Sequence, residues 1–150
     1  MSYTEIATRG LVLLGCGKMG SALLEGWLKG GINADAVYVL DPNPSDWLRA
    51  QGVHINEDLP QNPAIALLAV KPQMMGDALP RMVALGNGET LFLSIAAGTS
   101  IAHFEGALGA STPIVRSMPN TPAAVGKGIT AIIGNAHTTP SHLDMADGLL

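Results

Sequence analysis

The sequence predicts an α/β domain with a doubly wound, mostly parallel sheet and helices on both of its faces. Short apolar runs without polar alternation recur along the chain, as is typical of strands buried on both sides. Segments with helical apolar spacing, or with helix start and stop signals, lie between these runs. The chain has 150 residues, 47% of them hydrophobic and 13% charged, so it can bury one sizeable core.

Each apolar run is expected to form a strand, and each segment between runs a short helix. The expected strands are residues 11–14, 36–41, 53–55, 64–70, 90–95, 113–118 and 128–134. The expected helices are residues 19–29, 46–51, 74–85, 101–108 and a last one that opens near Ser141. Pro80 is expected to split the third helix, because proline removes a helical hydrogen bond. Ser100 and Thr139 are the expected N-caps, and right-handed crossovers then give the double winding.

Composition and charge exclude several classes of partner. The net charge is −4 and the 8 basic residues are scattered, which argues against a nucleic-acid surface. No run approaches the roughly 18 apolar residues of a membrane span, so no membrane partner is expected. A single cysteine and the lack of a signal-peptide core favour a cytoplasmic location. The histidines match no zinc-ligand spacing and are expected on the surface or in loops; they are His54, His103, His137 and His142.

A glycine-rich loop lies between the first expected strand and the first expected helix. In Gly15-x-Gly17-x-x-Gly20 the first glycine allows a tight turn, the second lets backbone approach a pyrophosphate, and the third allows close helix–strand packing. The following helix N-terminus offers unpaired N–H groups to phosphate. The pattern predicts a Rossmann-like dinucleotide site, against the alternative of an ordinary strand–helix turn. The expected binding residues are Gly15, Cys16, Gly17, Lys18, Met19 and Gly20. Cys16 is expected to fill the loop rather than to act as a redox-sensitive thiol.

Asp41 ends the second expected strand, roughly 20 residues after Gly20, where an acidic residue binds the adenosine ribose. Read alone it favours NAD, since a carboxylate repels a 2′-phosphate. Asn43 and Ser45 are nearby hydrogen-bond donors, and Arg49 is the nearest cation. Both NADH and NADPH therefore stay open as cofactors. The alternative is that Asp41 merely caps the next turn.

Three further segments follow expected strands, where parallel sheets place ligands. They are Ala69-Val-Lys-Pro-Gln73, Ser94-Ile-Ala-Ala-Gly-Thr99 and Arg116-Ser-Met-Pro-Asn-Thr-Pro-Ala123. Together with the glycine loop they closely resemble the pyrroline-5-carboxylate reductases, in order and spacing, from about Leu11 to the end of the chain. The resemblance implies hydride transfer from NADPH or NADH to the imine of 1-pyrroline-5-carboxylate, which gives L-proline.

The resemblance and the residue chemistry together nominate the rest of the site. Lys71 and Asn120 are the candidate catalytic residues, as orienting and polarising groups. Further expected cofactor contacts are Asp41, Asn43, Asn56, Ala69, Val70, Lys71, Pro72, Ala96, Ala97 and Gly98. A loop on the substrate side is expected from Met118, Pro119, Asn120, Thr121 and Pro122, whose prolines would hold its polar side chains in place. The alternatives are a solvated lysine, a simple tight turn at 96–98 and a rigid structural loop.

The last expected helix carries Leu143, Ala146, Leu149 and Leu150 on roughly one side, and the chain stops there without a C-cap. We expect residues 1–138 to form the dinucleotide-binding domain and residues 139–150 to begin a helix. The resemblance implies that this helix leads to a helical C-terminal domain, absent here, that forms a homo-oligomer and holds the substrate carboxylate. The chain alone is then expected to lack turnover. Alternatives are a short terminal helix, a related β-hydroxyacid dehydrogenase or imine reductase, and a non-catalytic dinucleotide sensor.

Overall fold

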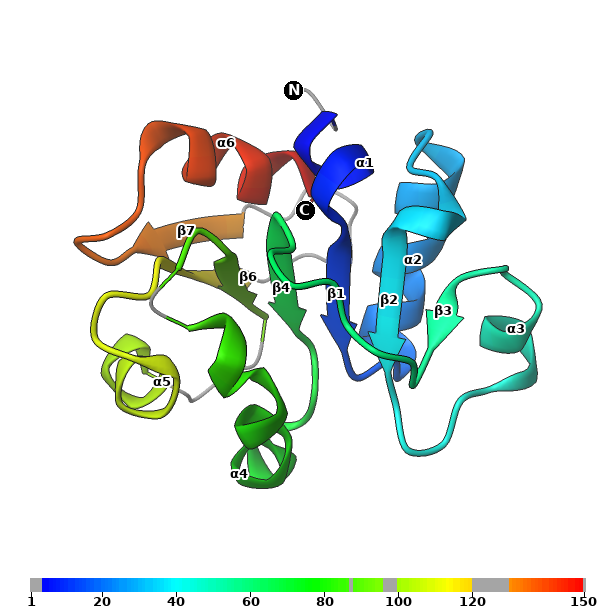
Figure 1. Ribbon diagram of the computed structural model, residues 1–150, viewed down its shortest axis with the longest axis horizontal. Coiled ribbons are helices and arrows are strands. Elements are labelled where there is room, and N and C mark those ends of the chain that lie inside the picture. Colours follow the sequence, from blue (N-terminus) through cyan, green and yellow to red (C-terminus); the bar gives the residue numbers. More distant parts are fainter. Residues whose placement is uncertain (1–3, 87, 96–99, 120–129, 150) are drawn as a thin grey trace.

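The computed structural model describes residues 4–86, 88–95, 100–119 and 130–149, which form one sheet covered by helices (Figure 1). Within these residues the sheet has seven strands in the order β3-β2-β1-β4-β5-β6-β7. Neighbouring strands are parallel, except that β6 and β7 are antiparallel. The strand order reverses between β1 and β4, so the carboxyl ends of these two strands flank the crevice where such sheets bind ligands. The Rossmann-like, doubly wound fold that the sequence predicts is confirmed.

The strands have nearly the bounds that the apolar runs predict. They are β1 (Leu11–Leu14), β2 (Val37–Leu40), β3 (His54–Ile55), β4 (Ile65–Leu68), β5 (Leu91–Ser94), β6 (Ile114–Pro119) and β7 (Thr130–Gly134). The α-helices are α1 (Thr4–Arg9), α2 (Lys18–Lys29), α3 (Asp46–Arg49), α4 (Met75–Ala78), α5 (Ile101–Leu108) and α6 (Pro140–Leu149). The 3₁₀ segments are η1 (Ala34–Ala36), η2 (Pro72–Met74) and η3 (Leu79–Leu85). Residues 128 and 129 of the last expected strand lie outside the described residues.

Alternate residues of the central strands pack into two hydrophobic clusters, one on each face of the sheet. In β1, Leu11 and Leu13 belong to the first cluster, whereas Val12 and Leu14 belong to the second. The first cluster is covered by α1, α2, α3 and α6, and the second by α4, η3 and α5. All four β1 side chains are buried, which explains why this run lacks polar alternation.

The helix signals in the sequence are confirmed. The Ser100 Oγ accepts a hydrogen bond from the backbone N–H of His103 at 3.1 Å, which caps α5. The Thr139 Oγ1 accepts from the N–H of His142 at 3.2 Å, and the Thr139 N–H donates to His142 Nδ1 at 3.0 Å. This is a reciprocal capping box in which histidine replaces the usual glutamate. Pro80 splits the expected helix 74–85 into α4 and η3.

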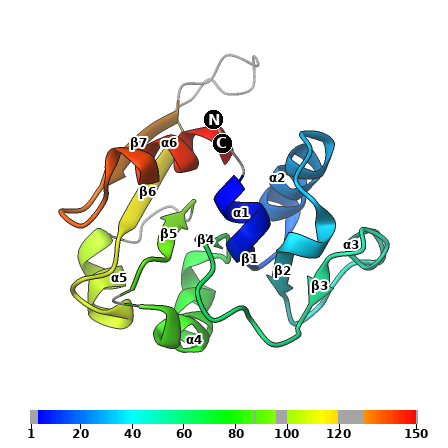
Figure 2. The ribbon, with the colours of Figure 1, turned by 45° about the horizontal axis from the view of Figure 1, so that its top comes forward.

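Helix α1 is an α-helix that the sequence does not predict. It has 6 residues and buries one side chain, Ile6, so it shows no helical periodicity. Its position is fixed by Arg9, whose guanidinium donates to the carbonyl oxygens of Asn62, Pro63 and Glu89 at 3.0 to 3.3 Å. Figure 2 shows α1 lying over the sheet between α2 and α6. No helix in the described part of the chain is long and apolar enough to cross a membrane.

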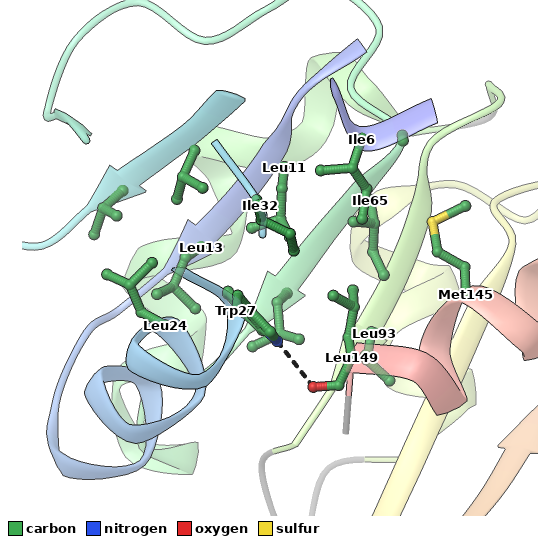
Figure 3. Close-up of a cluster of buried hydrophobic side chains, with 14 of the residues drawn as sticks. Ile6, Leu11, Leu13, Leu24, Trp27, Ile32, Ile65, Leu93, Met145 and Leu149 are labelled. Atoms are coloured by element: carbon green, nitrogen blue, oxygen red, sulfur yellow. Dashed lines mark hydrogen bonds between the residues drawn. The ribbon is translucent and has the colours of Figure 1, made fainter. Parts of the chain in front are cut away.

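The end of α6 is tied to α2 by one long-range hydrogen bond. Trp27 Nε1 donates to the Leu149 carbonyl oxygen at 2.9 Å, in buried surroundings (Figure 3). Trp27 itself is 3% exposed and packs in the first cluster with Leu149 and Met145. Of the apolar face expected for the last helix, Leu143, Ala146 and Leu149 pack in the first cluster, whereas Leu150 lies outside the described residues.

Candidate functional site

The glycine loop follows β1, and its three glycines have three different surroundings. Gly15 has φ +86°, and a Cβ there would lie 2.6 Å from Val70 Cγ1. A Cβ on Gly20 would lie 2.9 Å from the Gly15 carbonyl oxygen. A Cβ on Gly17 would meet no atom within 4 Å, so this glycine faces open space. The loop thus packs tightly on its inner side and leaves the middle glycine open to a ligand, as a pyrophosphate site requires.

The N-terminus of α2 continues this open surface. Gly17 is the N-cap, it is exposed, and no side chain in the described residues caps the first turn. Lys18, the first helical residue, is also exposed, and the first turn contains no acidic residue. Uncapped N–H groups, the positive end of the helix dipole and a lysine suit an anion. The residues present therefore fit the pyrophosphate of a dinucleotide.

Asp41 is held by backbone N–H groups from two loops. Cys16 donates its N–H to Asp41 Oδ2 at 3.0 Å, and Asn43 donates its N–H to Oδ1 at 2.9 Å. The sequence predicts Asp41 as a ribose ligand, and the structure adds that its carboxylate joins the glycine loop to the turn after β2. The alternative role, a cap of that turn, is fulfilled by the Asn43 contact, and the contact with the ribose stays a prediction.

Asn56 supports Asp41 from the end of β3. The Asp41 N–H donates to Asn56 Oδ1 at 2.9 Å, and Asn56 Nδ2 donates to the Asp41 carbonyl oxygen at 2.8 Å. Asn56 adopts φ 54°, a left-handed conformation that asparagine tolerates better than most residues. The expected contact of Asn56 with the adenosine stays a prediction. In the structure its side-chain amide holds the backbone of Asp41.

Cys16 is a buried part of the loop. It is 6% exposed, and its Sγ lies 3.5 Å from Ser21 Oγ. Burial raises the pKa of the Cys16 thiol, the Ser21 hydrogen bond opposes this, and the negative charge of Asp41 adds to it. A raised pKa is the opposite of what a reactive thiol needs. The geometry therefore favours the loop-filling role that we expect for this residue.

The segment after β4 lies directly against the glycine loop. β1 and β4 pair in parallel, with Leu14 opposite Leu68, so Val70 reaches Gly15. Val70 and Ala69 are half-buried, whereas Lys71 is exposed and forms no ion pair among the described residues. The structure thus brings Lys71 to the carboxyl edge of the sheet near the expected pyrophosphate site.

Several predicted site residues cannot be placed in this way. Ala96, Ala97, Gly98, Asn120, Thr121 and Pro122 lie outside the described residues. Others are placed by their backbone alone: Met19 in α2, Pro72 in η2, and Met118 and Pro119 in β6. Their roles stay predictions.

Arg116 is a site candidate that the sequence reasoning did not single out. It lies in β6 opposite Ser94 of β5, near the carboxyl edge of the parallel strands. Its Nε is shielded from solvent and has no hydrogen-bond partner in the described part of the chain. Since an unpaired buried N–H costs roughly 1–3 kcal/mol, this group is poised for an acceptor. A charged residue within an apolar strand was the signal in the sequence.

A separate cleft of about 540 Å³ lies between α1 and α6 and shares no residue with the glycine loop. Its acidic lining residues are Glu5, Asp144 and Asp147. Within the described residues no group of histidine, cysteine and acidic side chains is arranged to hold a metal ion. The residues that fit a dinucleotide, in the glycine loop and at the start of α2, therefore lie apart from this cleft.

Comparison with known proteins defines the class. Residues 10–98 match the family model described as NADP oxidoreductase coenzyme F420-dependent. Because this match covers more than half of the chain, the protein belongs to this family of oxidoreductases.

The individual relatives are pyrroline-5-carboxylate reductases. The chain is 35% identical to the enzyme of Escherichia coli K12 over 143 residues, which are 91% of this chain and 52% of the relative. It is 36% identical to that of Methanosarcina acetivorans over 140 residues, 89% of this chain and 52% of the relative. The chain therefore spans about half the length of the curated relatives that it matches. The resemblance indicated by the loop motifs is confirmed.

Solved structures of pyrroline-5-carboxylate reductases have the same fold as this chain. The reductase of Coxiella burnetii has a TM-score of 0.84 and 26% identity, and covers 95% of this chain and 55% of its own. The Plasmodium falciparum reductase, solved with NADP bound, has a TM-score of 0.78 and 25% identity, covering 95% of this chain and 54% of its own. Prephenate dehydrogenase from A. aeolicus has a TM-score of 0.71 at 14% identity, so that likeness shows the fold alone.

Proposed function

We propose that this chain is the dinucleotide-binding part of a pyrroline-5-carboxylate reductase. The enzyme would transfer hydride from C4 of NADH or NADPH to the C=N carbon of 1-pyrroline-5-carboxylate, giving L-proline. The observation that carries the proposal is the glycine loop. Gly15 and Gly20 are closed by their neighbours, and Gly17 opens onto an uncapped helix N-terminus. Gly31, in the turn after α2, is equally open, so it is the combination of the open Gly17 with the uncapped helix N-terminus that fits a pyrophosphate.

The residues of the chain would act by binding and orientation. The N–H groups at the start of α2 hold the pyrophosphate, with Lys18 adding a positive charge. Asp41 accepts hydrogen bonds from the adenosine ribose. The nicotinamide, when bound, supplies the hydride, and the imine nitrogen keeps the proton that makes its carbon electrophilic. Orientation and exclusion of water are then the main tasks of the protein.

Two cationic groups near the carboxyl edge are suited to orient the reacting partners. Lys71 follows β4 beside the glycine loop, and its ammonium is free to meet a phosphate, a ribose or a substrate carboxylate. Arg116 lies two strands away, since β5 lies between β4 and β6, and its Nε has no hydrogen-bond partner among the described residues. We keep Asn120 as a proposed polarising residue on the strength of the motif.

We also propose that the remaining half of such an enzyme is a helical domain that forms a homo-oligomer and completes the substrate site. The support is the resemblance and the length of the relatives, of which this chain spans 52% in the Escherichia coli case. The domain division at about residue 138 and a cytoplasmic location belong to the same proposal. The partner of the site is a small molecule, not a nucleic acid.

Turnover is tested by following NADH and NADPH oxidation with 1-pyrroline-5-carboxylate. Two proteins are compared: this chain, and a fusion that continues after Leu150 with the C-terminal half of the Escherichia coli relative. We expect turnover from the fusion alone, and its loss in a Lys71→Met fusion. A fusion that binds the cofactor and reduces a β-keto acid, but not the imine, would assign the chain to a different substrate class. A fusion that binds the cofactor and transfers no hydride to either would indicate a sensor.

A further inference from the structure

We propose that this chain selects NADH over NADPH, through a carboxylate that is held rigidly against the adenosine ribose position. The inference rests on the proposed function, because it concerns the same cofactor site. Both oxygens of Asp41 accept backbone hydrogen bonds: Oδ2 from Cys16 at 3.0 Å and Oδ1 from Asn43 at 2.9 Å. Hydrogen bonds to an ionised acceptor are short and strong. Rotation of the carboxylate away from a ligand would break both of them.

The backbone of Asp41 is fixed as well as its side chain. Asn56 accepts from the Asp41 N–H at 2.9 Å and donates to the Asp41 carbonyl at 2.8 Å. These four hydrogen bonds come from three loops, which follow β1, β2 and β3. Neither a side-chain rotation nor a backbone shift can therefore move the carboxylate without loss of several contacts.

The two cofactors differ in what they present to this carboxylate. An ionised carboxylate has about four acceptor positions, and two of those of Asp41 are occupied. The remaining positions suit a donor, and the ribose 2′-hydroxyl of NADH is one. The 2′-phosphate of NADPH has no proton to donate when fully ionised and brings about −1.5 to −2 charge. Two negative groups at contact distance repel each other strongly near a protein surface.

The segment that follows β2 offers little charge to neutralise a 2′-phosphate. Residues 41–58 contain four acidic residues and one arginine, a net charge of −3 before histidine is counted. The acidic ones are Asp41, Asp46, Glu57 and Asp58, and the arginine is Arg49. His54 is already engaged: its Nδ1 lies 3.2 Å from Glu57 Oε1, and its ring stacks on Tyr38. Arg49 is exposed at the end of α3. The Plasmodium falciparum relative holds NADP on the same fold, so the fold itself does not dictate the choice.

The test is a pair of fluorescence titrations on the 150-residue chain, with NADH and with NADPH. We expect NADH to bind at least about tenfold more tightly. Competition by 5′-AMP and by 2′,5′-ADP measures the effect of the 2′-phosphate alone, because the two nucleotides differ only in that group. We expect 5′-AMP to displace the bound cofactor more effectively, by a similar factor. Asp41→Asn removes the charge but keeps an acceptor oxygen, so the preference should shrink by about tenfold or more. Asp46→Asn is the matched control, since it removes one charge from the same segment without a contact to the glycine loop, and it should leave the ratio within about twofold.

The outcomes separate this inference from the proposed function. Tight binding with equal or higher affinity for NADPH overturns the inference and leaves the dinucleotide site intact. A shift in the Asp46→Asn ratio as large as that of Asp41→Asn overturns it too, because bulk charge would then set the preference. Binding of neither cofactor overturns both proposals. Circular dichroism shows whether Asp41→Asn folds. If it does not, the ratio of NADH to NADPH affinity of the wild-type chain and the nucleotide competition still test the inference.

Discussion

The glycine-loop crevice and the junction between α1, α2 and α6 are built on different principles. In the crevice, hydrogen bonds join loops at neighbouring strand ends, as between Cys16 and Asp41. At the junction, contacts join segments that are far apart in the sequence: Arg9 of α1 donates to Asn62, and Trp27 of α2 donates to Leu149 of α6. The glycine loop keeps Gly17 facing open space, whereas the junction buries the side chain of Trp27 against α6. The difference teaches that binding and stability are carried by separate sets of residues, which substitutions can distinguish.

The largest effect is expected at the junction. Trp27→Ala should lower the free energy of unfolding by about 3–5 kcal/mol, because it empties a site in a packed cluster. Trp27→Phe should cost about 1–2 kcal/mol, since it keeps most of the ring and loses the hydrogen bond to Leu149. Urea denaturation measures both. The folded fraction of each variant should bind NADH with wild-type affinity, and a weakened affinity would show that the two regions are coupled.

Gly15→Ala is expected to lower stability and cofactor binding together, because Gly15 packs tightly against Val70 inside the glycine loop. The new Cβ meets Val70 Cγ1 at 2.6 Å, and φ +86° is strained for any L-residue with a side chain. The expected loss is roughly 2–3 kcal/mol of stability together with loss of cofactor binding. Gly26→Ala is the control, because a Cβ there meets nothing within 4 Å and alanine favours helix. Wild-type stability of Gly15→Ala in urea denaturation would contradict the tight packing of the loop.

Arg9→Met should have a smaller effect on stability alone. It keeps the aliphatic stem and removes the donors to Asn62, Pro63 and Glu89, so about 1 kcal/mol of stability should be lost. Lys29→Met serves as control, because that ammonium is exposed and, among the described residues, its ion pair is with Glu25 on the same helix. Thermal denaturation compares the two. Equal melting temperatures would mean that α1 is held by Ile6 alone.

The smallest energetic effect concerns the thiol of the loop. Burial raises the pKa of Cys16 above its ordinary value of 9.0, so the folded chain holds the proton more tightly than the unfolded chain. The resulting stability is present below pH 9 and is lost as pH rises through the folded pKa. Iodoacetamide should therefore react at pH 8 much more slowly with the folded chain than with the chain in urea. Equal rates would place the thiol in solvent.

Sequence reasoning recovered the sheet because its strands are buried on both faces. Runs such as residues 64–70 show this directly, and the glycine loop is a local motif with a known geometry. Helix α1 was not predicted, because its single buried residue, Ile6, gives no helical periodicity in the sequence. The amides that hold Asp41 were not predicted either. The backbone groups that contact a carboxylate are determined by the three-dimensional course of three loops, which the sequence does not show. Arg116 could not be recognised as a site candidate from the sequence. Only the strand register and the absence of a partner for its Nε among the described residues identify it.

Gly17→Ser tests most directly whether the open middle glycine of the loop is a cofactor site. Serine is a favourable N-cap, so the variant should be as stable as wild type or slightly more so. Its side chain occupies the open space and takes up an N–H that phosphate needs. Fluorescence titration should show NADH binding by the wild-type chain and at least about tenfold weaker binding by the variant. Equal affinity of the two proteins would contradict the account.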